Sequence, residues 1–97
     1  MLERNFQPDL IREISELIPG CVVVKNDPTY LQGFPDLTVH LGPRSAHLEC
    51  KRSQNESHRP NQDYYVNLIN SQGGFARFIY PENKNEVLYE LQQSFGV

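Results

Sequence analysis

The fold of this chain is decided by residues 36–51, which read DLTVHLGPRSAHLECK. On both sides of a central Gly-Pro pair, apolar residues alternate with polar ones, which is typical of strands that bury one face. Glycine and proline between two such runs indicate a turn. The stretch therefore predicts a hairpin with strands over 36–41 and 46–51 and a turn over 42–45.

The alternation assigns each side chain of this hairpin to one of two faces. The apolar face is expected to hold Leu37, Val39, Leu41, Ala46, Leu48 and Cys50. The opposite face is expected to hold Asp36, Thr38, His40, His47, Glu49 and Lys51.

Two carboxylates and one amine on a shared sheet face suggest a chemical site. With a turn over 42–45, Asp36 pairs with Lys51 and lies diagonal to Glu49, with the two backbones roughly 7–8 Å apart. A divalent ion with oxygen ligands at about 2.0–2.6 Å can bridge carboxylates at such a separation. Metal-assisted phosphodiester hydrolysis needs such a cation and a positive group beside the attacking water. The alternative is an ordinary solvated strand edge.

The same register makes His40 and His47 face each other across the hairpin. Two histidines can suggest zinc, but they lack the further ligands of a zinc site, because Cys50 points the opposite way. Histidines that are satisfied by hydrogen bonds within the sheet are the better interpretation.

The rest of the chain supplies three helices and two more strands. Apolar residues at helical spacing predict a helix over 6–18, and a buried-type run predicts a strand over 21–24. A second helix is expected from Pro60 to about Gln72, a strand over 75–80, and a C-terminal helix after it. The order is αβββαβα.

Composition places the chain among globular proteins of one domain. It has 97 residues, of which 38% are hydrophobic and 22% are charged. The net charge of −3 is awkward for a protein that binds nucleic acid, but basic residues outnumber acidic ones between residues 44 and 59. A local basic rim of this kind is sufficient for phosphate contact.

Compartment is indicated by the cysteines and by the absence of long apolar runs. Cys21 and Cys50 lie in apolar strand-like segments, so we expect reduced, buried thiols and no disulfide. No apolar run is long enough to span a membrane, and Glu3 and Arg4 argue against a signal peptide. A soluble cytoplasmic protein is expected.

Asp36 followed by Glu49-X-Lys51 within an αβββαβ order resembles the PD-(D/E)XK nuclease superfamily. Gly33-Phe34-Pro35-Asp36 and the later Gln62-Asp63-Tyr64-Tyr65 further resemble its VRR-NUC branch, particularly small stand-alone phage-type members. The resemblance covers nearly the whole chain. It implies a single domain over residues 1–97 with a restriction-endonuclease-like αβββαβ core, a four-stranded mixed sheet flanked by helices, and an added C-terminal helix.

The resemblance also implies a set of catalytic residues. Asp36 and Glu49 would bind Mg²⁺ or Mn²⁺, and the backbone carbonyl of Cys50 would complete the ligands from the protein. Lys51 would orient the water and stabilise charge on the phosphate. Gln62 would contact the lysine, the water or the substrate from the second helix.

An acidic residue of the first helix is also implied near the metal. Glu3 is the first candidate because it extends the apolar stripe of that helix towards its start; acidic residues at a helix start also simply favour its dipole. Glu13 is the second candidate and Glu16 the third.

Contacts to nucleic acid are expected from the polar loop before the second helix and from that helix. The candidates are Arg52, His58, Arg59 and Tyr65. The alternatives are that His58 and Arg59 belong to a solvated loop and that Tyr65 is a core aromatic. The sequence leaves open whether the segment with Lys25, Asp27 and Tyr30 approaches DNA.

The expected function is therefore that of a Mg²⁺- or Mn²⁺-dependent DNA endonuclease. By resemblance it is structure-selective for branched DNA such as a Holliday junction, acts as a homodimer in DNA repair, and works in the cytoplasm of a bacterium or phage-infected cell. Recruitment by a helicase or replication protein is left open. The alternative is a non-catalytic nuclease-like module that binds branched DNA or a replication or repair partner. A weaker third possibility is a nuclease directed at RNA or a mobile element.

Overall fold

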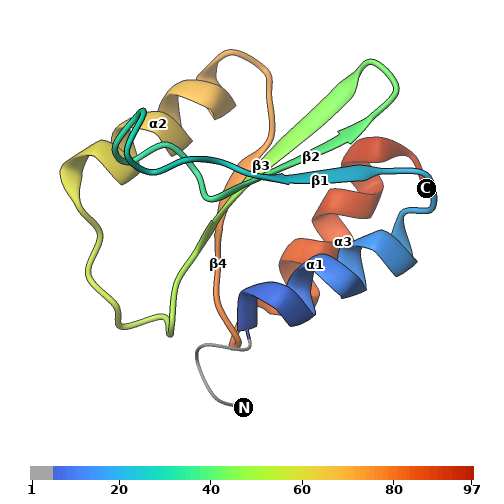
Figure 1. Ribbon diagram of the computed structural model, residues 1–97, viewed down its shortest axis with the longest axis horizontal. Helices are drawn as coiled ribbons and strands as arrows, with labels where there is room; N and C mark the ends of the chain where they lie inside the picture. The colour runs from blue at the N-terminus through green and yellow to red at the C-terminus, as the bar shows by residue number, and fades with distance from the viewer. Residues whose placement is uncertain (1–5) are drawn as a thin grey trace.

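Four strands form a mixed sheet at the centre of the molecule (Figure 1). The computed structural model describes residues 6–97. Strands β1 (Val22–Lys25), β2 (Leu37–Leu41) and β3 (Arg44–Cys50) are antiparallel neighbours, and β4 (Ala76–Ile79) pairs parallel to β3. The strand order is β1-β2-β3-β4, so β1 and β4 are the edges.

Three helices cover the two faces of the sheet. Helices α1 (Phe6–Leu17) and α3 (Lys84–Phe95) lie together on one side, and α2 (Pro60–Ser71) lies on the other (Figure 1). A parallel pair of strands needs a long crossover, and α2 provides it between β3 and β4. The order αβββαβα is confirmed, as is an α/β fold with a four-stranded mixed sheet. No helix within residues 6–97 is both long and apolar enough to cross a membrane.

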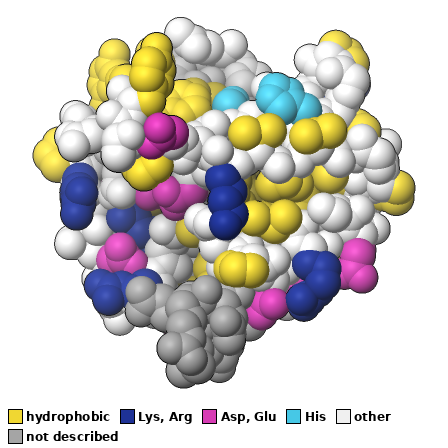
Figure 2. Space-filling view, viewed as in Figure 1, with side chains coloured by type: hydrophobic (Ala, Val, Ile, Leu, Met, Phe, Trp, Pro, Cys, Tyr) yellow, Lys and Arg dark blue, Asp and Glu magenta, His cyan; other side chains and the backbone are white. Residues whose placement is uncertain are grey.

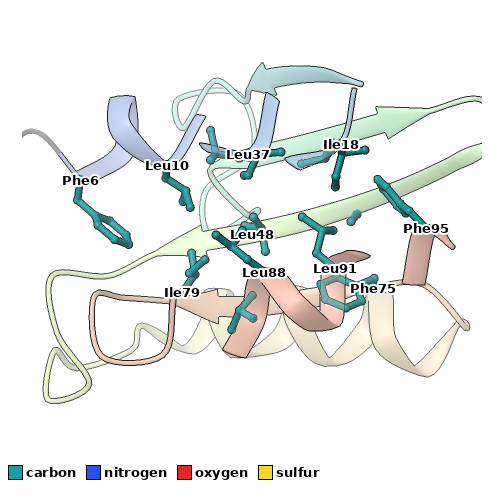
Figure 3. Close-up of a cluster of buried hydrophobic side chains, with 14 residues drawn as sticks. Phe6, Leu10, Ile18, Leu37, Leu48, Phe75, Ile79, Leu88, Leu91 and Phe95 are labelled. Atoms are coloured by element: carbon teal, nitrogen blue, oxygen red, sulfur yellow. The ribbon is translucent and has the colours of Figure 1, made fainter. Parts of the chain in front are cut away.

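One hydrophobic cluster fills the space between the sheet and helices α1 and α3 (Figure 3). From the hairpin it contains Leu37, Val39, Ala46 and Leu48, all fully buried. Cys21 and Cys50 are free thiols that pack against this cluster. The predicted apolar face is therefore confirmed, while the two thiols, expected to be buried, are half-buried.

The register of the hairpin differs from the predicted one by two residues. Its turn consists only of Gly42 and Pro43, so that Leu41 pairs with Arg44. Gly42 has φ +62°, and a proline holds φ near −65°. This combination corresponds to a type II′ turn, whose twist matches that of the flanking strands. The expected four-residue turn is therefore wrong.

The shorter turn changes which residues of the site face each other. Leu37 pairs with Leu48, and continuing this register by one position sets Asp36 opposite Glu49. The predicted pairing of Asp36 with Lys51 is wrong. Because the slip is two residues and side chains alternate with period two, each side chain still lies on its predicted face.

Candidate active site

Charged side chains are buried between the sheet and α2. Glu49 and Lys51 are each only 4% exposed, although they belong to residue types that are almost never buried without a partner. Figure 2 shows acidic and basic side chains next to one another on the left half of the side that it displays. A buried charge is costly unless it is paired and hydrogen-bonded, so the partners of these two residues define the site.

Gln62 connects the two buried charges. Lys51 Nζ donates to Gln62 Oε1 at 2.6 Å, and Gln62 Nε2 donates to Glu49 Oε2 at 2.8 Å. The backbone N–H of Arg59 also donates to Gln62 Oε1, at 3.0 Å. This last bond is half of a capping box, because Arg59 is the N-cap of α2 and Gln62 is its third helical residue. The start of α2 therefore sets the position of Gln62.

Asp36 lies at the same end of the sheet, directly before β2. Its Oδ2 accepts a hydrogen bond from the backbone N–H of Cys50 at 2.9 Å. Asn26 holds the segment from the other side, because its Nδ2 donates to the Pro35 carbonyl and to Thr38 Oγ1, each at 2.9 Å. The carboxylates of Asp36 and Glu49 are thus carried by neighbouring strands.

Gly33 brings the loop before Asp36 against the first turn of α2. It has φ +86°, and a Cβ at this position would collide with Cβ of Asn61 and lie 2.8 Å from the Asn61 backbone carbon. Only a residue without a side chain permits this approach. Gly33 therefore helps to place the loop that leads to Asp36 beside the helix that carries Gln62.

Burial and mutual repulsion change the acidity of both carboxyls. The pKa of Glu49 is raised to about 7, chiefly by burial and secondly by the Asp36 charge, while Lys51 and the backbone N–H of Asp36 oppose part of the rise. Burial also raises the pKa of Asp36, against the opposing effects of the Cys50 N–H and Lys51. Two acids that repel each other when ionised are a chemical setting that favours a cation.

The loop between β3 and α2 closes over Lys51. Lys51 Nζ donates to the Ser57 carbonyl at 3.2 Å and lies 3.7 Å from Glu56 Oε2. Glu56 Oε1 accepts from the backbone N–H of Arg52 at 2.6 Å. Glu56 was not predicted as a site residue, because its four-residue spacing from Arg52 is the only signal of this contact in the sequence.

The donor set fits a hard divalent cation. Glu49 Oε1 is buried and accepts no hydrogen bond from residues 6–97. Asp36 supplies a second carboxylate, and carboxylate oxygens are the ligands that Mg²⁺ and Mn²⁺ prefer. Within the described part of the chain, no three His, Cys, Asp or Glu side chains gather into a group that could hold a metal. The side chains brought together for a cation are therefore two.

Neither Glu13 nor Glu16, the two candidate acids within the described part of the first helix, is brought to this pair. Glu3 lies outside the described residues. Glu13 forms an ion pair with Lys84 of α3, with 2.9 Å between Oε2 and Nζ. Glu13 and Glu16 both line a groove between α1 and α3, which lies on the core side of the sheet.

The candidate DNA contacts are partly committed to contacts within the protein. The side chain of Arg52 pairs with Glu56 at 3.3 Å. His58 stacks on Phe78 with 3.9 Å between ring centroids and pairs with Asp63 at 3.0 Å. The Arg52–Glu56 pair lies within the loop before α2, whereas the contacts of His58 fasten that loop to β4 and α2.

Two further candidates remain next to the site. Arg59 is exposed at the start of α2. Tyr65 packs edge-on against Phe34, with 5.6 Å between ring centroids, and is partly exposed. It is therefore not a residue of the main core.

The two histidines do not face each other. His47 pairs with Thr38, and its Nδ1 lies 3.0 Å from Thr38 Oγ1, whereas His40 pairs with Ser45. Burial lowers the pKa of His47, and repulsion from His40 lowers it further. The predicted facing arrangement is wrong, while the hydrogen bond of His47 agrees with its interpretation as a satisfied sheet histidine.

The site thus combines two carboxylates, a buried lysine and a bridging glutamine at one end of the sheet. Comparisons of this chain with protein-family models, with curated proteins and with solved structures found no match.

Proposed function

We propose that this chain is a divalent-metal-dependent DNA endonuclease with a restriction-endonuclease-like fold of the VRR-NUC type. One observation carries the proposal: Glu49 and Lys51 are buried on one sheet face, are bridged by Gln62, and lie beside Asp36. A buried Lys-Gln-Glu arrangement is a costly way to stabilise a fold, since apolar residues of similar volume often serve as well or better. Its chemistry suits charge neutralisation at a phosphate.

Each residue has a role in this proposal. Asp36 and Glu49 hold Mg²⁺ or Mn²⁺, together with the backbone carbonyl of Cys50. The cation, when bound, supplies Lewis-acid neutralisation of the phosphate charge. Lys51 Nζ donates a hydrogen bond to a phosphate oxygen or to the attacking water. Gln62 holds the side chains of Lys51 and Glu49 in position by hydrogen-bonding both of them. The Lys51 side chain is only 3% exposed, because Glu56 and the Ser57 carbonyl cover its amine. A bound substrate therefore displaces these two groups from Lys51 Nζ.

Branched DNA is the proposed substrate, and a homodimer is the proposed form. Edge strand β1 exposes Val22 and Val24, which are 58% and 41% accessible. An exposed apolar edge is a template for pairing with another strand. A second copy paired there would relate two sites by a twofold axis, which suits two symmetric cuts in a four-way junction.

The direct test is cleavage by the purified protein. Four-way junction, flap, nicked and linear DNA would be incubated with Mg²⁺, Mn²⁺ or EDTA. We expect metal-dependent cuts that favour branched DNA. Equal cleavage of linear and branched DNA would contradict junction selectivity and leave the nuclease assignment intact.

Variants assign the cuts to this site. Asp36→Ala and the isosteric Asp36→Asn should abolish cleavage, and Lys51→Ala should slow it about 100-fold, as the loss of a transition-state donor does. Asp9→Ala is the matched control, because Asp9 also follows a proline but lies in α1 and pairs with Arg12. If both Asp36 variants cleave at the wild-type rate in the presence of metal, the proposal that this site performs the cleavage is refuted.

The alternative is a nuclease-like module that binds branched DNA or a repair partner without cutting. One observation favours it. Within residues 6–97 only two acidic side chains, Asp36 and Glu49, come together, whereas the resemblance implies a third acid from the first helix. DNA binding that is equal in wild type and Asp36→Ala, with no cleavage by either, would support this alternative.

A further inference from the structure

A hollow lies beside the candidate active site and is not used by the proposed chemistry. It has a volume of about 540 Å³, which is within the range of small-molecule pockets. Its lining consists of Asn26, Asp27, Tyr30, Leu31 and Phe34, all from the loop between β1 and β2. Figure 2 shows hydrophobic side chains gathered at the upper left, where Figure 1 places this loop and α2.

Two aromatic rings of different character border the hollow. The Tyr30 side chain is exposed, with 87% of the residue accessible. Phe34 is held edge-on by His47 and Tyr65, with centroid distances of 5.5 and 5.6 Å. One ring is therefore held in place and the other is accessible, which suits a flat apolar group that enters from solvent.

The charge of the lining selects among ligands. None of the five lining residues is a lysine or arginine, and Asp27 is an acid. A phosphate is therefore disfavoured within the hollow itself. A neutral ring system is favoured, since bases of any sequence stack on aromatic side chains.

The short distance between the hollow and Asp36 limits which nucleotide can place its base in the hollow. Phe34 is two residues before Asp36, and consecutive Cα atoms are 3.8 Å apart, so their Cα atoms lie at most about 7.6 Å apart. Pro35 between them is fully buried. Stacked nucleotides rise about 3.4 Å each, so a base in the hollow belongs to a nucleotide within about two of the phosphate at Asp36.

We propose that this hollow accepts one unpaired nucleobase of the DNA strand whose phosphodiester lies at Asp36 and Glu49. The site rests on the proposed function, because that function places the strand beside the loop. It names the substrate more closely: DNA with an unpaired base next to the cut. Tyr30 and Phe34 are the residues that stack on this base.

The test is a binding experiment with Asp36→Asn protein in Mg²⁺, so that the DNA stays intact. Three duplexes would be compared: one fully paired, one with a single unpaired 2-aminopurine, and one with an abasic residue at that position. We expect about tenfold tighter binding of the 2-aminopurine duplex than of the other two, and quenching of its fluorescence by stacking.

Substitutions at Tyr30 identify the ring that stacks. Added to the same protein, Tyr30→Ala should remove the tenfold preference, and Tyr30→Phe should keep it because the ring is retained. Tyr89→Ala is the matched control, since Tyr89 is 63% exposed on α3, which covers the other face of the sheet. Tyr30 is so exposed that its replacement leaves the fold intact.

Two results would overturn the nucleobase site. One is unchanged preference and quenching in Tyr30→Ala; the other is equally tight binding of the abasic duplex. Wild-type cleavage in Mg²⁺ and Mn²⁺, measured in parallel, separates this failure from failure of the proposed function. Cleavage without a base preference would refute the nucleobase site and leave the proposed endonuclease intact. A base preference without cleavage would refute the endonuclease and leave the nucleobase site intact.

Discussion

Glu49 is the residue whose environment makes the sharpest prediction in the absence of substrate. Its carboxyl has a pKa of about 7 in the folded protein, against an ordinary value of 4.5. The folded state therefore binds more protons than the unfolded chain between these values, so its contribution to stability is full below about pH 4.5 and is lost as the pH rises through 7. The loss is on the order of 3 kcal/mol, since one pKa unit corresponds to about 1.4 kcal/mol.

Glu49→Gln should therefore gain stability relative to wild type as the pH rises. In EDTA, we expect the difference in unfolding free energy to move in favour of the variant by on the order of 3 kcal/mol between pH 5 and pH 8. Urea unfolding at both pH values measures it. Mg²⁺ should restore wild type at pH 8, since a cation favours the ionised carboxylate. Parallel pH profiles for the two proteins would show that burial of this carboxyl has no energetic consequence.

At the scale of elements, the contact between the β1–β2 loop and α2 depends on Gly33. Gly33→Ala and Gly42→Ala both place an alanine at positive φ, but Gly42 has open space around its Cβ direction while Gly33 meets Asn61. Gly42→Ala should cost about 1 kcal/mol for its backbone alone. Gly33→Ala should cost about 1–3 kcal/mol more, as overpacking does, and should slow cleavage. Thermal and urea unfolding measure both, and equal costs would mean that the loop and α2 separate freely.

The same elements show where local patterns suffice. The two faces of the hairpin were predicted from alternation, because a period of two depends only on neighbouring residues. The register was not, because it depends on whether Gly42 and Pro43 close the turn alone or with the next two residues. The prediction that Asp36 pairs with Lys51 was wrong for this reason. The two-residue slip preserved the shared face of Asp36, Glu49 and Lys51.

At the scale of the whole molecule, edge strand β1 predicts the oligomeric state. We expect a dimer for wild type and a monomer for Val24→Lys, because a lysine on an exposed edge opposes pairing. Size-exclusion chromatography with light scattering measures the mass. Gln93→Lys adds the same charge at an exposed position of α3 and should leave the dimer intact. A monomeric wild type, or a dimer that tolerates Val24→Lys, would exclude pairing through this strand.

The sequence by itself determined the order of the elements, the buried face of the hairpin and the grouping of Asp36, Glu49 and Lys51 on the opposite face. These features follow from periodicity, turn residues and chain order, all of which are local. Only the tertiary structure decided the pairing register, the burial of Glu49 and Lys51 under α2, the approach of Glu56 to Lys51 and the hollow beside Tyr30. The register depended on whether two or four residues close the turn at Gly42, a choice that alternation does not encode. The other three depend on segments that meet through longer loops, and no short-range pattern in the chain encodes where such loops lie.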